Sequence, residues 1–105
     1  MTASGAPARE CLESLDPAER ARILRLYQKL ADSGRIHNVE HFKKLEGTEF
    51  WQFKGHQARF LGVFEPGGRF VVLTGFVKKS RRTPRSEIDR ARHVLNEYRI
   101  LRRER

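Results

Sequence analysis

The chain has 105 residues, 38% of them hydrophobic and 33% charged, and this length suits a single domain, residues 1–105, with a modest core. Lysine and arginine total 22 against 13 acidic residues, so the formal net charge is +9 and the expected partners are polyanions such as nucleic acid. The single cysteine, Cys11, excludes an internal disulfide and a multi-thiolate zinc site, and no apolar run approaches the roughly 20 residues of a membrane span, so no membrane partner is expected.

The start of the chain, MTASGAPARE, lacks the apolar core that follows the basic residues of a signal peptide. This observation predicts a cytoplasmic protein. Residues 1–6 are small and polar, and we expect them to be disordered.

The next segment predicts a helical hairpin. Residues 7–15 form a short helical stretch with leucines three apart on one face. A second helix begins with Asp16 as its cap, Pro17 in the first helical position and Glu19 at the position that closes a capping box. Its apolar residues keep the helical period until Gly34, a residue type that favours a helix end.

The middle of the chain changes from a helical to an alternating pattern. One turn of helix is expected around Phe42 and Leu45. Short aromatic segments then predict strands over residues 49–53 and 57–64. A turn rich in proline and glycine leads into residues 69–77, the longest apolar run, which we interpret as a central strand with both faces partly buried.

A last helix opens at Thr83 and Pro84. Its apolar residues form a narrow stripe: Ile88, Ala91, Leu95 and Tyr98. Arginines in the last turns suit the negative end of the helix dipole. The order of elements predicts an α+β domain, with an N-terminal helical hairpin packed on a small antiparallel sheet and a C-terminal helix.

The sequence predicts neither a metal nor a cofactor. His37 and His41 stand four residues apart, but with only Glu40 nearby we interpret them as exposed polar residues. Cys11 lies on a predicted core helix and is interpreted as a small buried hydrophobic residue rather than a reactive thiol. The glycine pair before the longest strand lacks the lysine and hydroxyl residue of a phosphate-binding loop.

Cations alternate with aromatic residues along the predicted strands. Five basic residues can converge on one surface of the sheet or on its rim: Lys54, Arg59, Arg69, Lys78 and Lys79. Four cations fall in five positions between the last strand and the last helix: Lys78, Lys79, Arg81 and Arg82. Exposed at strand ends, such side chains gain little from ion pairs, and with aromatic residues they suit the binding of a nucleic-acid strand. The alternative for the aromatic residues is that they fill the core.

The segment from Lys43 to Tyr98 resembles the HigB-like, phage-derived branch of the RelE/ParE toxin superfamily. The resemblance rests on the spacing of short motifs: Leu45-x-Gly47, Trp51, Arg59, Gly75-Phe76-x-Lys78-Lys79, Thr83-Pro84 and Glu87-Ile88-x-x-Ala91. The chain departs from the family in two places. The family usually begins with a strand ahead of the helical hairpin, and many relatives have Trp-Glu-Leu-Arg where this chain has Trp51-Gln52-Phe53-Lys54.

The resemblance implies a RelE-like fold and a toxin of a type II toxin–antitoxin system. Such toxins are typically metal-independent endoribonucleases that cut mRNA in the ribosomal A site. The implied partners are therefore the ribosome, mRNA and a cognate antitoxin, often of the helix-turn-helix type.

The resemblance also implies a phosphate site formed by Arg59 and the pair Lys78 and Lys79. For the proton transfers, Lys54 or His56 is a candidate base, and Tyr98 is a candidate stacking residue or acid. Three further arginines are candidates for RNA binding: Arg69, Arg81 and Arg82.

Two other functions stay open at this point. The ParE branch shares the scaffold but inhibits DNA gyrase by binding to it, without cutting RNA. A relative whose chemistry has decayed would bind RNA without cleaving it.

Overall fold

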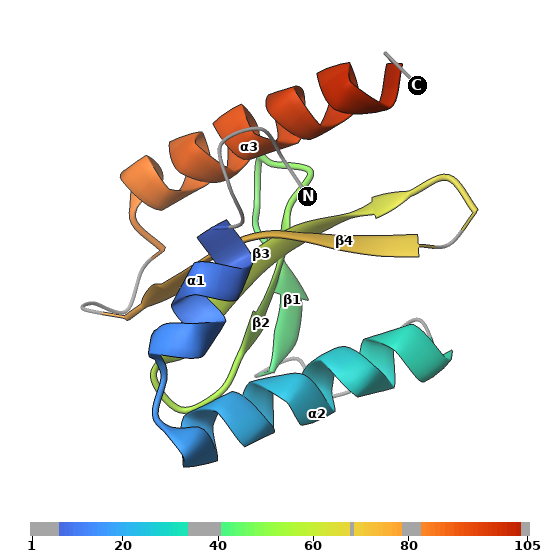
Figure 1. Ribbon diagram of the computed structural model, residues 1–105. Helices are drawn as coiled ribbons and strands as arrows, with labels where there is room; N and C mark the ends of the chain where they lie inside the picture. The colour runs from blue at the N-terminus through green and yellow to red at the C-terminus, as the bar shows by residue number, and fades with distance from the viewer. Residues whose placement is uncertain (1–6, 34–40, 68, 79–82, 104–105) are drawn as a thin grey trace.

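The computed structural model describes residues 7–33, 41–67, 69–78 and 83–103, and these contain three helices and four strands (Figure 1). In chain order the elements are α1 (Pro7–Ser14), α2 (Pro17–Ser33), β1 (Phe42–Lys44), β2 (Trp51–Lys54), β3 (Ala58–Glu65), β4 (Arg69–Val77) and α3 (Arg85–Arg103). Each strand pairs antiparallel with the next, so the sheet order is β1-β2-β3-β4. The helical hairpin covers one face and α3 the other, which confirms the predicted α+β architecture. The prediction of disorder for residues 1–6 lies outside the described residues.

The helical hairpin forms where the sequence predicts it. The Asp16 carboxylate accepts a hydrogen bond from the backbone N–H of Glu19 at 3.0 Å, so α2 has the expected cap. The Arg20 guanidinium donates to three backbone carbonyl groups near the end of α1, those of Leu12, Glu13 and Leu15, at 2.9 to 3.3 Å. Carbonyl groups at a helix end lack partners within the helix, so Arg20 helps to fix how the two helices meet.

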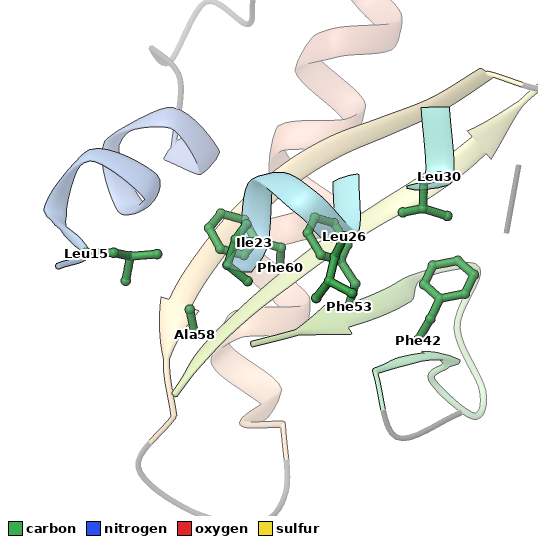
Figure 2. Packing of buried hydrophobic residues seen from close by; sticks show 8 residues of the cluster. All are labelled: Leu15, Ile23, Leu26, Leu30, Phe42, Phe53, Ala58 and Phe60. Atoms are coloured by element: carbon green, nitrogen blue, oxygen red, sulfur yellow. The ribbon is translucent and has the colours of Figure 1, made fainter. Parts of the chain in front are cut away.

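The first hydrophobic core lies between the helical hairpin and the sheet (Figure 2). It contains aliphatic side chains from the helices and mainly aromatic ones from the strands: Leu15, Ile23, Leu26, Leu30, Phe42, Phe53, Ala58 and Phe60. The rings of Phe53 and Phe60 stack across β2 and β3 with their centroids 5.4 Å apart. For these aromatic residues, the interpretation as core residues is confirmed.

The second core lies between α3 and the opposite face of the sheet. Its buried members come from both layers: Phe50, Leu61, Val63, Leu73, Ala91, Val94 and Leu95. Ile88 and Tyr98 pack against this cluster, so all four residues of the predicted apolar stripe face the sheet. Across the described ranges, no helix has the length and apolarity needed to cross a membrane.

The expected turn of helix around Phe42 is wrong. Phe42 begins β1 and pairs with Phe53 of β2, while its ring stacks on Trp51 with the centroids 4.9 Å apart. A strand of three residues is too short for its alternation to be read from the sequence. The burial of one aromatic ring against the sheet decides the conformation of this segment.

The expectation that residues 69–77 form a central strand is also wrong. Within the described ranges β4 pairs with β3 alone and lies at an edge, whereas β3 is interior and buried along its first six residues. Its apolar composition has another cause. Because α1 packs on one face of β4 and α3 on the other, both faces are covered without a second neighbouring strand.

A β-bulge interrupts the pairing of β3 with β4. Leu61 lies opposite Thr74, whereas the next residue, Gly62, lies opposite Val72. Leu73 is therefore an extra residue in β4. An extra residue reverses the alternation of side chains along the rest of its strand.

Candidate functional site

Three cations from neighbouring strands lie at one end of the sheet. Lys54, the last residue of β2, is directly opposite Arg59 of β3, and Arg59 is opposite Phe76 of β4. Lys78 follows β4, and its backbone N–H donates to the carbonyl oxygen of Gln57 at 2.9 Å. This hydrogen bond extends the pairing by one residue beyond the strand.

The alternation of side chains places these three cations on the same face. Leu61, two residues after Arg59, belongs to the core under α3, and Phe76, two residues before Lys78, packs against that core. Lys78 reaches this face because of the bulge earlier in β4. We call Lys54, Arg59 and Lys78 the sheet-end cations.

Arg59 is buried, with 7% of its surface accessible, so the expectation of an exposed strand-end cation is wrong for this residue. Its Nη1 donates to the carbonyl oxygen of Ala58 at 3.0 Å. Burial lowers the pKa of the Arg59 guanidinium, and the nearby Glu19 carboxylate opposes that change. An arginine side chain nevertheless stays charged, and a charge of low exposure acts more strongly on an anion than one in water.

The Glu19 carboxylate fixes the turn between β2 and β3. It accepts hydrogen bonds from the backbone N–H groups of His56 at 2.8 Å and Gln57 at 2.6 Å. Burial alone would raise the pKa of Glu19, but these two N–H groups and that of Ala58 hold the pKa below its ordinary value. The turn that joins Lys54 to Arg59 is thus attached to the start of α2.

A second contact attaches the start of α3 to the sheet beside the same site. Gln52 of β2 lies opposite Leu61, and only 6% of its surface is accessible. Its Oε1 accepts a hydrogen bond from the Thr83 hydroxyl at 2.7 Å. Thr83, just before α3, therefore contacts the sheet two residues along β2 from Lys54.

The structure divides the remaining predicted site residues into three groups. The side chain of His56 is exposed in the turn at the same end as the sheet-end cations. Lys79, Arg81 and Arg82 lie outside the described residues, as does His37. Arg69 and Tyr98 lie at the other end of the sheet.

Tyr98 is separated from the sheet-end cations by the length of β4. Its hydroxyl oxygen accepts a hydrogen bond from Nη2 of Arg69, the first residue of β4, at 3.1 Å. Lys78 follows the last residue of that strand. The geometry thus supports Lys54, Arg59 and Lys78 as one site and does not bring Tyr98 to it.

No group of three or more histidine, cysteine, aspartate or glutamate side chains able to hold a metal ion occurs among the residues that the structure describes. His93, on the outer side of α3, pairs with Glu97 one turn away, Nε2 to Oε1 at 2.7 Å. Cys11 is half-buried, and its burial raises the pKa of the thiol, which disfavours the reactive thiolate.

The sequence does not identify Glu19 and Gln52, two residues outside the sheet-end cations whose hydrogen bonds attach the neighbouring segments to each other. The sequence predicts only a helix-cap role for Glu19, because nothing in a sequence shows a partner 37 or 38 residues away. Gln52 carried a signal, since it stands where many relatives of the resembled family have glutamate. Its hydrogen bond to Thr83 gives that position a structural role.

The sheet-end cations suit an anion with more than one charged oxygen. Three basic residues lie on one face at one end of the sheet, and Arg59 is held in place by its burial and by its hydrogen bond. Fixed charges of this kind stabilise negative charge that develops in a phosphoryl transition state, without reorganisation during the reaction. Lys54 and His56 lie at this end and can also transfer a proton, and the same holds for His41, whose carbonyl oxygen accepts a hydrogen bond from the backbone N–H of Lys54 at 3.0 Å.

Comparison with protein families shows a match to the family described as "Phage derived protein Gp49-like (DUF891)" over residues 10–96. The matched range extends from α1 into α3 and includes all three sheet-end cations. A search of curated proteins found no match to the chain.

Proposed function

The chain belongs to the Gp49-like family of phage-derived proteins, a family of RelE/HigB-like toxins, and from this premise we propose that it is the toxin of a type II toxin–antitoxin system. We further propose that it belongs to the HigB-like branch and that it is a metal-independent endoribonuclease acting on mRNA at the ribosome. An antitoxin partner follows from the family, and a helix-turn-helix antitoxin is part of the proposal. The proposed location is the cytoplasm, where ribosomes and mRNA are found.

The observation that carries the proposal is the placement of Lys54, Arg59 and Lys78 on one face at one end of the sheet. The resemblance assigns Arg59 and the Lys78–Lys79 pair to phosphate. Arg59 and Lys78, the two described members of that set, lie on one face at one end of the sheet with Lys54, which supports this assignment. A basic protein of net charge +9 also suits a polyanionic target.

The proposed reaction uses the 2′-hydroxyl of the RNA as nucleophile. A base takes the proton of this hydroxyl, the 2′-oxygen bonds to the adjacent phosphorus, and the bond to the 5′-oxygen breaks as that oxygen takes a proton. Arg59 and Lys78 would stabilise the extra negative charge on the phosphorus oxygens. His56 or neutral Lys54 would act as the base, because both lie at the same end of the sheet.

The test is to induce the protein in bacterial cells and to map mRNA 5′ ends, with and without a translation inhibitor, alongside DNA breaks. We expect new mRNA ends that disappear when translation is blocked. Lys78→Ala should remove them. Arg25→Ala, which removes the same charge from the exposed side of α2, should keep them.

Two results would replace this proposal. Intact mRNA with DNA breaks that depend on gyrase would support a ParE-like inhibitor. RNA binding without cleavage, under conditions in which the protein is folded, would support a relative that only binds RNA.

A further inference from the structure

At the end of the sheet away from the sheet-end cations, two arginines share one oxygen atom. Nη2 of Arg69 and Nη1 of Arg102 each donate to the hydroxyl oxygen of Tyr98, both at 3.1 Å. The Arg102 guanidinium also lies over the Tyr98 ring, 5.7 Å from its centroid. The arginines come from the first residue of β4 and the last turn of α3, which lie at the same end of the molecule (Figure 1). We call Arg69, Tyr98 and Arg102 the far-end cluster.

Two like charges on one neutral oxygen call for an explanation. Neither Arg69 nor Arg102 has an ion pair in the part of the chain that the structure describes. Arg99, one turn earlier on α3, shows the contrasting case, because its Nη2 lies 3.1 Å from a carboxylate oxygen of Glu49. The negative end of the helix dipole favours Arg102, but it does not account for Arg69, which belongs to a strand.

The far-end cluster holds several hydrogen-bond donors close together. Each arginine uses one N–H group on the Tyr98 oxygen and has other N–H groups to donate, and the Tyr98 hydroxyl keeps its own proton as a donor. A tetrahedral phosphate, with several acceptor oxygens, suits this arrangement better than a planar carboxylate, which one arginine fork can satisfy.

We propose that the far-end cluster binds a backbone phosphate of the RNA strand whose scissile phosphate lies at the sheet-end cations. This inference rests on the proposed function, because it takes RNA as the target. Arg69 contacts α3, so both cation groups lie on the α3 side of the sheet. Nine residue steps separate Arg69 from Lys78, which is about 30 Å along the strand. The cluster would hold the strand at a distance from the reacting phosphate.

The experiment measures binding of a fluorescent single-stranded 2′-O-methyl RNA by anisotropy over a range of salt concentrations. The methyl group removes the nucleophile, so binding is measured without cleavage. For wild-type protein, the logarithm of the binding constant should fall linearly with the logarithm of salt concentration. Arg69→Ala and Arg102→Ala should each reduce that slope by about 0.7, as for one lost phosphate contact on a single strand, and weaken binding about tenfold at low salt.

Arg99→Ala is the matched control. It removes the same charge from the same end of α3, but from an arginine already paired with a carboxylate. Its slope should stay close to that of the wild type. Tyr98→Phe keeps the ring and removes the hydroxyl, so it should weaken binding by less than either far-end arginine variant. Circular dichroism and thermal melting check that each variant is folded.

Several results would overturn the inference. If Arg69→Ala and Arg102→Ala behave like Arg99→Ala, the cluster makes no specific phosphate contact. If both variants bind RNA like the wild type but lose affinity for the antitoxin, the cluster is a docking site for an acidic protein segment. The proposed nuclease function is tested separately, by mRNA cleavage in cells. If no cleavage is found there but Arg69→Ala and Arg102→Ala still reduce the salt slope of RNA binding, the phosphate contact is supported and the nuclease function is not.

Discussion

The carboxylate of Glu19 accepts a hydrogen bond from the backbone N–H of Gln57 at 2.6 Å, although 38 positions separate the two residues in the sequence. One carboxylate therefore connects the helical hairpin to the turn that joins two of the sheet-end cations. The helix start and the proposed site are mechanically linked through this contact. Its loss would affect both the stability of the fold and the position of Arg59.

The first prediction concerns pH. The folded protein holds the pKa of Glu19 below its ordinary value of about 4.3, because backbone N–H groups bind the charged form. The stabilisation is therefore fully present above the pKa of the unfolded chain, and it is lost as the pH falls through the lower folded-state pKa. Glu19→Gln should destabilise the protein at pH 7 by about 1–3 kcal/mol. Urea unfolding of both proteins between pH 7 and pH 3 should show this difference shrinking in acid, and a constant difference would contradict the account.

The second prediction separates charge from folding at the sheet end. Lys78 is half-buried beyond the end of β4, so Lys78→Ala should change the free energy of unfolding by less than about 1 kcal/mol while removing mRNA cleavage. Arg59→Ala should destabilise more than that, because it removes a buried side chain with a hydrogen bond. Arg59→Lys keeps a charge but loses the planar fork, and we expect partial activity.

For both positions, chemical denaturation gives stability and induction in cells gives toxicity. Full toxicity of Lys78→Ala together with Arg59→Lys would show that these cations do not form the phosphate site. Lys79→Ala is still predicted to remove toxicity with little change in stability.

A third prediction tests the contact between Gln52 and Thr83. Gln52→Leu and Thr83→Val each remove one side of a part-buried hydrogen bond, so their effects on unfolding free energy should not add. We expect a coupling energy of about 1 kcal/mol in the double-mutant cycle. Gln52→Glu keeps an acceptor for the Thr83 hydroxyl and should retain the coupling. Additive effects on the unfolding free energy would mean that Gln52 and Thr83 do not stabilise each other.

The fourth prediction uses Leu95, a residue of α3 that is almost completely buried against the sheet, with 1% of its surface accessible. Leu95→Ala should destabilise the protein by about 2–5 kcal/mol, measured by thermal or urea unfolding. This variant is the control for lost folding. If Leu95→Ala and Lys78→Ala both lose toxicity in proportion to their lost stability, the cations have a structural role rather than a chemical one.

The elements with strong local signals could be predicted from the sequence. Asp16 and Pro17 specify the start of α2, and the apolar stripe of α3 keeps a helical period over about three turns, so both helices lie where expected. β1 could not be predicted, because its three residues depend on the stacking of Phe42 against Trp51, a contact set by the tertiary structure.

The candidate site was only partly predictable for a related reason. Which basic residues share a face depends on the register of the strands, and which share an end depends on the sheet order. The sequence therefore indicates a set of basic residues, and only the pairing of β2, β3 and β4 shows that Arg59 and Arg69 lie at opposite ends of the sheet. The burial of Arg59 had no sequence signal, since a basic residue next to a turn is normally exposed.

The extra residue at Leu73 has a consequence for comparing this chain with its relatives. In β4 the odd-numbered residues up to Leu73 face α3. After Leu73 the even-numbered residues face α3 instead. A relative that lacks the bulge must be aligned with a one-residue gap in this strand. An ungapped alignment would match Lys78 to a residue that points toward the helical hairpin, and it would misjudge which basic residue of that relative faces α3.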